Sequence, residues 1–199
     1  MLDPCVLQDG RGSSPISAAT FYDLRVTESP RKIRVVGDPV LAQVAEPVTS
    51  FDAELATLID ELFAALAVAE GVGLAAPQIG VSQAVFVYDC PDATGERVRG
   101  HVVNPTIEIS GPLEENEEGC LSVPGPFHPL PRASHAVVHG VDRHGEPIEV
   151  SGDGFFARCL QHETDHLRGV LYIDHLPRNR RRRVMREMEP FDWNAPVPG

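Results

Sequence analysis

Hydrophobic residues between positions 50 and 70 recur with the spacing of an amphipathic α-helix. The apolar side chains stand three or four positions apart, at Leu55, Leu58, Ile59, Leu62 and Leu66. Ser50 or Asp52 can cap the start of this helix by accepting hydrogen bonds from its free N–H groups. We expect Gly71 and Gly73 to end it.

Beyond residue 80 the pattern changes to short runs of β-branched and aromatic residues, which favour strands. These runs cover residues 84–88, 101–103, 106–109, 136–138, 147–150 and 170–173. The segment 142–145 has the composition of a hairpin turn that leads into the run at 147–150.

A second helix is expected to begin near Ser151 or Asp153 and to end at Gly169, a residue type common just after helix C-termini. Strands thus flank two principal helices without a regular βαβ alternation. The pattern therefore predicts an α+β fold rather than a doubly wound sheet.

The same pattern predicts one domain, from residue 31 to residue 189. Residues 1–30 are rich in glycine, serine and proline, which predicts a flexible N-terminal extension. Residues 190–199 include three prolines and are expected to form a flexible C-terminal tail. A chain of 199 residues suits this organisation.

Composition and charge favour a globular protein over one that binds nucleic acid or membranes with its whole surface. Hydrophobic residues make up 42% of the chain, as in globular proteins, and the net charge of −12 argues against a surface that binds nucleic acid or anionic lipid throughout. No apolar run approaches the roughly 20 residues of a membrane helix. The N-terminus lacks the features of a secretory signal. We expect a cytoplasmic protein.

The second predicted helix carries the sequence His-Glu-Thr-Asp-His at 162–166. His162 and His166 lie one turn apart on one helix face, so both imidazoles can reach one metal ion. Glu163 can place its carboxylate beside a water on that metal. Taken alone, the pattern also fits two ordinary surface histidines.

A catalytic site of this kind usually has a third protein ligand. Asp174 and His175 are candidates downstream, but His175 does not have the extended HExxHxxGxxH spacing. Upstream, Cys120 lies in a glycine-flanked segment, and its thiolate would suit iron, zinc, nickel or cobalt. Taken singly, each of the four cysteines is more simply a buried free thiol.

A glycine-rich segment covers residues 71–80. It has neither the phosphate-loop pattern nor the third glycine of a dinucleotide-binding motif. The side-chain amide of Gln78 could donate to a developing oxyanion. A capping or surface glutamine is the simpler interpretation of that segment alone.

Three segments together resemble the peptide deformylase family and follow one another in that family's order. They are GVGLAAPQIG at 71–80, EGCLSVPG at 118–125 and QHETDHLRG at 161–169. The resemblance covers roughly Arg34 to Asp174. It implies β-sheets, antiparallel or mixed, packed around the helix that carries HExxH. It also implies an enzyme of N-terminal processing, which removes the formyl group from the N-formylmethionine of newly synthesised polypeptides and releases formate.

The resemblance further implies a catalytic ferrous ion, which zinc, nickel or cobalt can replace, with Cys120, His162 and His166 as joint ligands. A metal-bound water would attack the formyl carbon, with Glu163 as general base and then acid. The Gln78 amide and the Leu121 backbone N–H would stabilise the oxyanion.

Other roles concern the substrate and the surroundings of the metal. Gly73 would pair its backbone with the extended substrate. The resemblance puts four residues near the methionine side chain, namely Val72, Phe155, Phe156 and Cys159. Phe156 and Cys159 could instead simply belong to the core. Glu118 and Arg132 are candidates for a charge pair that fixes the Cys120 loop, or for two solvated charges.

A basic segment follows the last motif. Residues 178–188 contain six arginines, from Arg178 to Arg186, and one glutamate. This segment therefore has a net charge of +5, and the other residues together have a net charge of −17. Bacterial deformylases dock on the ribosome through a basic C-terminal helix, so the resemblance implies a ribosomal partner. An arginine run is more often a solvated face. We expect a monomer.

Two other functions fit parts of the pattern. A metallopeptidase with HExxH would cleave peptide bonds and ignore the formyl group. A ribosome-associated or metal-storing relative would bind metal without turnover, although storage needs neither Glu163 nor Gln78.

Overall fold

The computed structural model describes residues 31–188. The expectations for residues 1–30 and for 190–199 therefore lie outside the described residues, as does Cys5. Five strands and three α-helices occur in the described part, together with three short 3₁₀-helices. In chain order they are η1 (Pro39–Ala42), α1 (Ala53–Val68), β1 (Gly73–Ala75), η2 (Ala76–Ile79), β2 (Val85–Pro91), β3 (Arg97–Cys120), β4 (Val123–Val141), β5 (Pro147–Asp153), α2 (Gly154–Leu167), η3 (Tyr172–Asp174) and α3 (Arg178–Met188).

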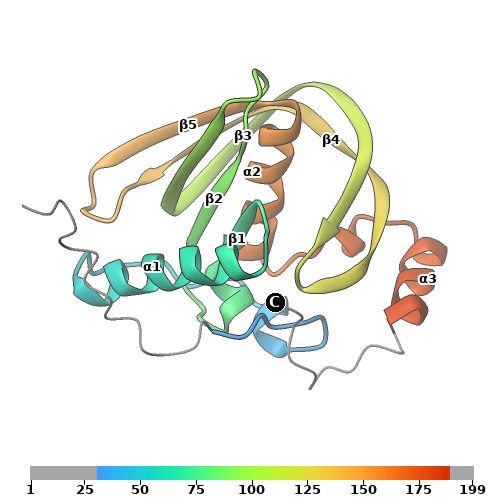
Figure 1. Cartoon of the computed structure of the whole chain (residues 1–199), viewed down its shortest axis with the longest axis horizontal. Helices are drawn as coiled ribbons and strands as arrows, with labels where there is room; N and C mark the ends of the chain where they lie inside the picture. The colour runs from blue at the N-terminus through green and yellow to red at the C-terminus, as the bar shows by residue number, and fades with distance from the viewer. Residues whose placement is uncertain (1–30, 189–199) are drawn as a thin grey trace, which may run out of the picture.

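The strands form one antiparallel sheet in the order β1-β2-β3-β4-β5, so that each strand pairs with its neighbour in sequence. Figure 1 shows the sheet curving around α2, with α1 outside it and α3 beside the first half of β4. The α+β expectation is confirmed, with a single sheet around the helix that carries HExxH.

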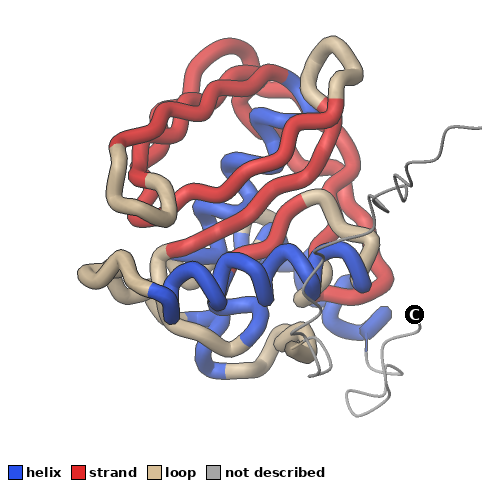
Figure 2. Tube along the Cα trace, turned by 60° about the vertical axis from the view of Figure 1, so that its left-hand side comes forward, coloured by secondary structure: helices blue, strands red, loops and turns tan. Residues whose placement is uncertain are grey.

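Strand β2 separates two hydrophobic clusters because its side chains alternate between the faces of the sheet. Phe86 and Cys90 face α2 and pack with Phe156 and Leu160, whereas Val85 and Val87 belong to the cluster under α1. The two layers are visible in Figure 2, where α1 crosses below the curved strands. This packing holds α2 rigidly against the sheet.

The predicted helices are present, with shifted ends. Asp52, and not Ser50, caps α1 by accepting hydrogen bonds from the N–H groups of Glu54 and Leu55. The helix ends at Val68, before the glycines expected to stop it, and Gly73 belongs to β1. Helix α2 begins after Asp153 because Ser151 still pairs with β4.

The strand expected at 170–173 is wrong. Leu171, Tyr172 and Ile173 are buried at successive positions, whereas a strand would turn every second side chain to the opposite face. The Asp174 carboxylate accepts from the Leu171 N–H at 2.9 Å and closes a tight 3₁₀ turn. This turn packs with Val184 of α3 in a third cluster.

The runs at 101–103 and 106–109 are parts of one strand, β3, with an irregularity between them. The turn expected at 142–145 does connect β4 to β5, since Asp142 accepts from the N–H groups of His144 and Glu146. No helix among residues 31–188 is long and apolar enough to span a membrane.

Candidate metal centre

Cys120 is placed by a tight hairpin. It is the last residue of β3 and pairs with Val123, the first residue of β4, so that only Leu121 and Ser122 form the turn. The Ser122 backbone N–H donates to the Cys120 Sγ at 3.3 Å. This hydrogen bond fixes the position of the Cys120 sulfur within the hairpin.

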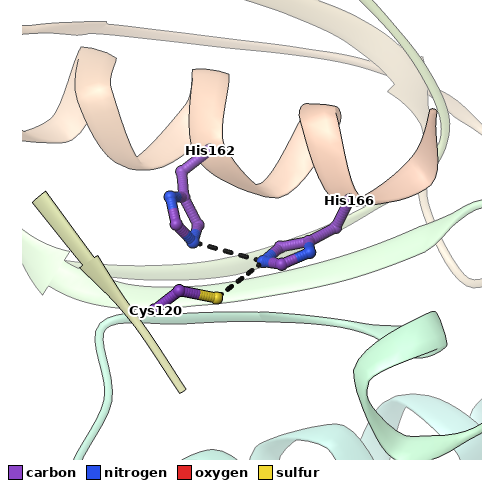
Figure 3. A group of neighbouring side chains, drawn as sticks. All are labelled: Cys120, His162 and His166. Atoms are coloured by element: carbon purple, nitrogen blue, oxygen red, sulfur yellow. Dashed lines mark hydrogen bonds between the residues drawn. The ribbon is translucent and has the colours of Figure 1, made fainter. Parts of the chain in front are cut away.

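Helix α2 brings His162 and His166 to the same point. Their Nε2 atoms lie 3.2 Å apart, and the Cys120 Sγ lies 3.3 Å from the Nε2 of His166 (Figure 3). All three potential ligand atoms lie within 4.8 Å of one another. Tetrahedral Zn–N and Zn–S bonds of about 2.0 and 2.3 Å place neighbouring donor atoms at similar separations. The donor set therefore fits one divalent transition-metal ion.

The two downstream candidates make other contacts. Asp174 binds the Leu171 N–H and the Arg181 guanidinium, and the Nε2 of His175 lies 2.8 Å from the Asp165 carboxylate. Neither residue belongs to the converging group of Cys120, His162 and His166.

Glu118 links the centre to Arg132 in the protein interior. Its Oε1 lies 2.8 Å from the Nδ1 of His162, and Arg132 donates to both carboxylate oxygens, at 2.7 and 3.1 Å. Both charged side chains are buried, so they form a pair and are not two solvated charges. Burial alone would raise the pKa of Glu118, but the hydrogen bonds from His162 and Arg132 lower it well below its usual range.

Glu163 follows His162 on α2, and its side chain is almost completely buried. Its Oε2 has no hydrogen-bond partner among residues 31–188. Burial raises the pKa of Glu163 to about 7, because the charged form loses its hydration. A carboxyl group with that pKa can both accept and return a proton near neutral pH.

Gly73 makes room for this carboxylate. A Cβ at Gly73 would stand 2.8 Å from the Cδ of Glu163, which no ordinary contact allows. Gly73 begins β1, one of the two edge strands of the sheet, which within residues 31–188 pairs only with β2. The other edge of β1 can therefore accept an extended peptide as an additional strand.

Gln78 is buried, so the alternative of a surface glutamine is wrong, but its side chain does cap η2, as the capping alternative expected. Its Oε1 accepts from the Ala75 N–H at 2.8 Å, which turns the Nε2 toward the hairpin. There the amide donates to the Ser122 Oγ at 3.2 Å and lies 3.7 Å from the Cys120 Sγ. The amide N–H groups thus face the candidate metal centre, as does the turn that contains Leu121.

The four residues expected near the methionine side chain differ in exposure. Val72 and Phe155 are 39% and 49% exposed, whereas Phe156 and Cys159 are buried. The Cys159 thiol donates to the Val72 carbonyl at 3.6 Å, so these two residues are neighbours. The Phe156 ring packs 5.1 Å from the Tyr88 ring in the core between α2 and the sheet.

Three further residues, which no sequence pattern had indicated, surround the centre, namely Ser122, Arg158 and Asp165. Asp165 accepts from the Nη1 of Arg132 at 2.6 Å, and Arg158 donates to Glu118 at 2.8 Å. The signal for Arg158 is its position four residues before His162, which puts both on one face of α2.

Comparisons with known proteins agree with this geometry. A family model described as "Polypeptide deformylase" matches residues 30–182. The peptide deformylase of Acidothermus cellulolyticus is 51% identical over 163 residues, which cover 82% of this chain and 88% of that protein. Peptide deformylase 1 of Streptomyces avermitilis is 51% identical over 172 residues, 84% of this chain and 79% of that protein.

Solved structures of peptide deformylases have the same fold. The crystal structure from Legionella pneumophila has a TM-score of 0.75 at 43% identity, over 82% of this chain and 95% of that one. The Ehrlichia chaffeensis enzyme in complex with actinonin has a TM-score of 0.75 at 33% identity, over 81% of this chain and 97% of that one. The chain therefore belongs to the polypeptide deformylase family, whose enzymes remove the N-terminal formyl group from newly made polypeptides.

Proposed function

We propose that this chain deformylates nascent polypeptides through the centre formed by Cys120, His162 and His166. Its substrate is N-formylmethionine at a peptide N-terminus, and its products are formate and a free methionyl amine. The observation that carries the proposal is the convergence of these three donors with the Glu163 carboxylate and the Gln78 amide.

The metal in this proposal is ferrous iron, which zinc, nickel or cobalt can replace. One thiolate and two imidazoles form a donor set that all four ions accept. Once bound, such a cation lowers the pKa of a water molecule and polarises a carbonyl group. A ferrous site with a thiolate is also sensitive to oxygen, so purification without air should preserve activity.

Glu163 is the general base and then the general acid. It takes a proton from the attacking water and later delivers it to the leaving amine, so that the C–N bond breaks without a free amide anion. The pKa of about 7 that burial gives this carboxyl supports both steps. A cation beside Glu163 would lower that pKa, which favours the base form at the start of the cycle.

Gln78 and the Leu121 backbone N–H stabilise the oxyanion of the tetrahedral intermediate. The fixed orientation of the Gln78 amide supports this role, because a preoriented donor needs no reorganisation as charge develops. In the free enzyme Ser122 accepts from the same amide group.

The substrate backbone extends β1 at Gly73, and the methionine side chain enters a pocket near Val72, Phe155, Phe156 and Cys159. The edge of β1 that no strand within residues 31–188 covers supports the first contact. The exposed apolar surface of Val72 and Phe155 supports the second.

A comparison of two peptides tests the proposal. A formyl-methionyl tripeptide and the same tripeptide without the formyl group are incubated with enzyme purified anaerobically, whose metal content is measured. We expect formate from the first peptide and no cleavage of the second. Cleavage of the second at an internal bond would identify a metallopeptidase, and metal binding without either reaction would identify a storage protein.

Ribosomes in the cytosol present the proposed substrate. The exposed arginines of α3 support electrostatic docking there, since rRNA is a polyanion. The enzyme would act as a monomer, because Cys120, His162, Glu163 and Gln78 all come from one chain.

A further inference from the structure

Arg158 is a buried cation that the proposed reaction does not use. It lies on α2 four residues before His162, with a side-chain exposure of 7%. Its Nη1 donates to the Glu118 Oε2 and to the Leu130 carbonyl, both at 2.8 Å, and its Nη2 donates to the Glu114 carbonyl at 2.7 Å. One guanidinium thus connects α2 with β3 and β4.

The hydrogen bond from Arg158 completes the set of hydrogen bonds that the Glu118 carboxylate accepts. Oε1 faces Arg132 and His162, while Oε2 faces Arg132 and Arg158. A carboxylate offers about four lone-pair sites. Each site of Glu118 therefore has a partner, and removal of Arg158 would leave one site on Oε2 empty inside the protein.

The charges near Glu118 also need two arginines. Arg132 divides its donors between the carboxylates of Glu118 and Asp165, and these two acids exceed its charge by one. Arg158 supplies the second positive charge. A buried charge without a partner is strongly unfavourable, so Glu118 would shift from its position if Arg158 were absent.

We propose that Arg158 is a positioning residue that holds the two halves of the metal centre in register. It fixes Glu118, which orients His162 through Nδ1 and leaves Nε2 for the metal. It also ties α2, which carries both histidines, to the β3–β4 hairpin, which carries Cys120. This inference rests on the metal centre proposed above.

The test measures metal retention and coordination geometry, and not only activity. Arg158→Met removes the three hydrogen bonds at similar side-chain length. Nickel-loaded protein is exposed to excess EDTA and the rate of metal release is followed, and the visible spectrum of the cobalt-substituted protein is recorded. We expect nickel release at least tenfold faster than in the wild type, since substitutions around metal ligands cost about 10–100-fold in affinity. We also expect the cobalt absorption bands to change.

Arg143→Met is the matched control. Arg143 is partly buried and, like Arg158, pairs with a carboxylate, that of Asp60, but it lies in the β4–β5 turn and makes no contact with Glu118. We expect wild-type release and wild-type cobalt bands. Arg158→Lys, which can contact Glu118 but cannot form all three bonds, should give intermediate release.

Unchanged release and cobalt bands in Arg158→Met would overturn the proposal, even if the melting temperature fell, because Arg158 would then serve only the scaffold. If Arg158→Met does not fold, Arg158→Gln is judged by the same two readings. A wild-type protein that binds neither nickel nor cobalt would refute the metal centre itself and this inference with it. Metal bound equally well by wild type and variant would refute the role of Arg158 alone.

Discussion

At the scale of single residues, the role proposed for Glu163 allows metal binding and catalysis to be tested separately. Its carboxylate is not one of the three converging donors, and its Oε2 has no partner among the described residues. Glu163→Gln keeps the shape of the side chain but removes its basicity. We expect metal content near the wild-type value and formate release about a hundred- to ten-thousand-fold slower. A variant with normal metal content and most of its activity would exclude Glu163 as the general base.

Gly73 allows a second test at the same scale. In Gly73→Ala the new Cβ would press on the Cγ and Cδ of Glu163, at 2.9 and 2.8 Å, and displace the carboxylate. We expect normal metal content with a kcat lowered at least tenfold, as measured by formate release. Gly71→Ala is the control, because its Cβ would meet the movable ends of Leu66 and Leu121, and it should change kcat much less. Equal losses in both variants would contradict this explanation.

The sequence identifies the residues of the candidate site better than it identifies their partners. His162 and His166 have the spacing of metal ligands, Cys120 joins them only through the family resemblance, and the structure brings all three together. The burial of Glu118 with two arginines depends on how α2 meets the β3–β4 hairpin. Such a contact, across 40 positions for Arg158 and Glu118, leaves no periodic pattern in the sequence.

At the scale of elements, local preference and tertiary packing agree for much of residues 31–188, and two places show how they can disagree. The acidic stretch at residues 114–118 has few strand-forming residues. It nevertheless belongs to β3, because each of its residues pairs with a residue of β4. The apolar run at 170–173 favours a strand, yet it forms a turn because Asp174 caps it and three successive side chains are buried. In both places long-range contacts determine the structure.

Asp174→Ala tests the second case. Its carboxylate accepts from the Leu171 N–H and pairs with Arg181, and both distances are 2.9 Å. Loss of a capping side chain costs about 1 kcal/mol, and at this chain length each kcal/mol lowers the melting temperature by about 2–4 °C. Calorimetry should show such a decrease. Asp60→Ala removes an exposed ion pair with Arg143 and should change the melting temperature by less than half as much. Equal shifts would show that the cap does not stabilise η3.

At the scale of the whole molecule, the charge is divided unequally. The segment 178–188 carries +5 in a chain of net charge −12. Val184 and Met188 anchor α3 in the third hydrophobic cluster, so its arginines face solvent. An acidic body with one basic helix is suited to approach a polyanion with that helix first.

Arg178, Arg182 and Arg186 are the best positions to test this orientation, because none of the ion pairs formed within residues 31–188 uses them. Replacing all three with glutamate keeps Val184 and Met188 and therefore the anchor of α3. We expect ribosome co-sedimentation to weaken at least tenfold at low salt and its salt dependence to flatten, since fewer phosphate contacts remain. Hydrolysis of a free formyl-methionyl tripeptide should stay unchanged, because α3 contributes none of the converging donors.

The control replaces Arg31, Arg97 and Arg168 with glutamate, which changes the net charge by the same amount at exposed positions outside α3. If total charge alone governed the association, both triple variants would lose it equally. If α3 is the docking element, the control keeps most of its binding. Ribosome binding that neither variant weakens would exclude an electrostatic interface at α3 and would leave the arginines as a solvated helix face.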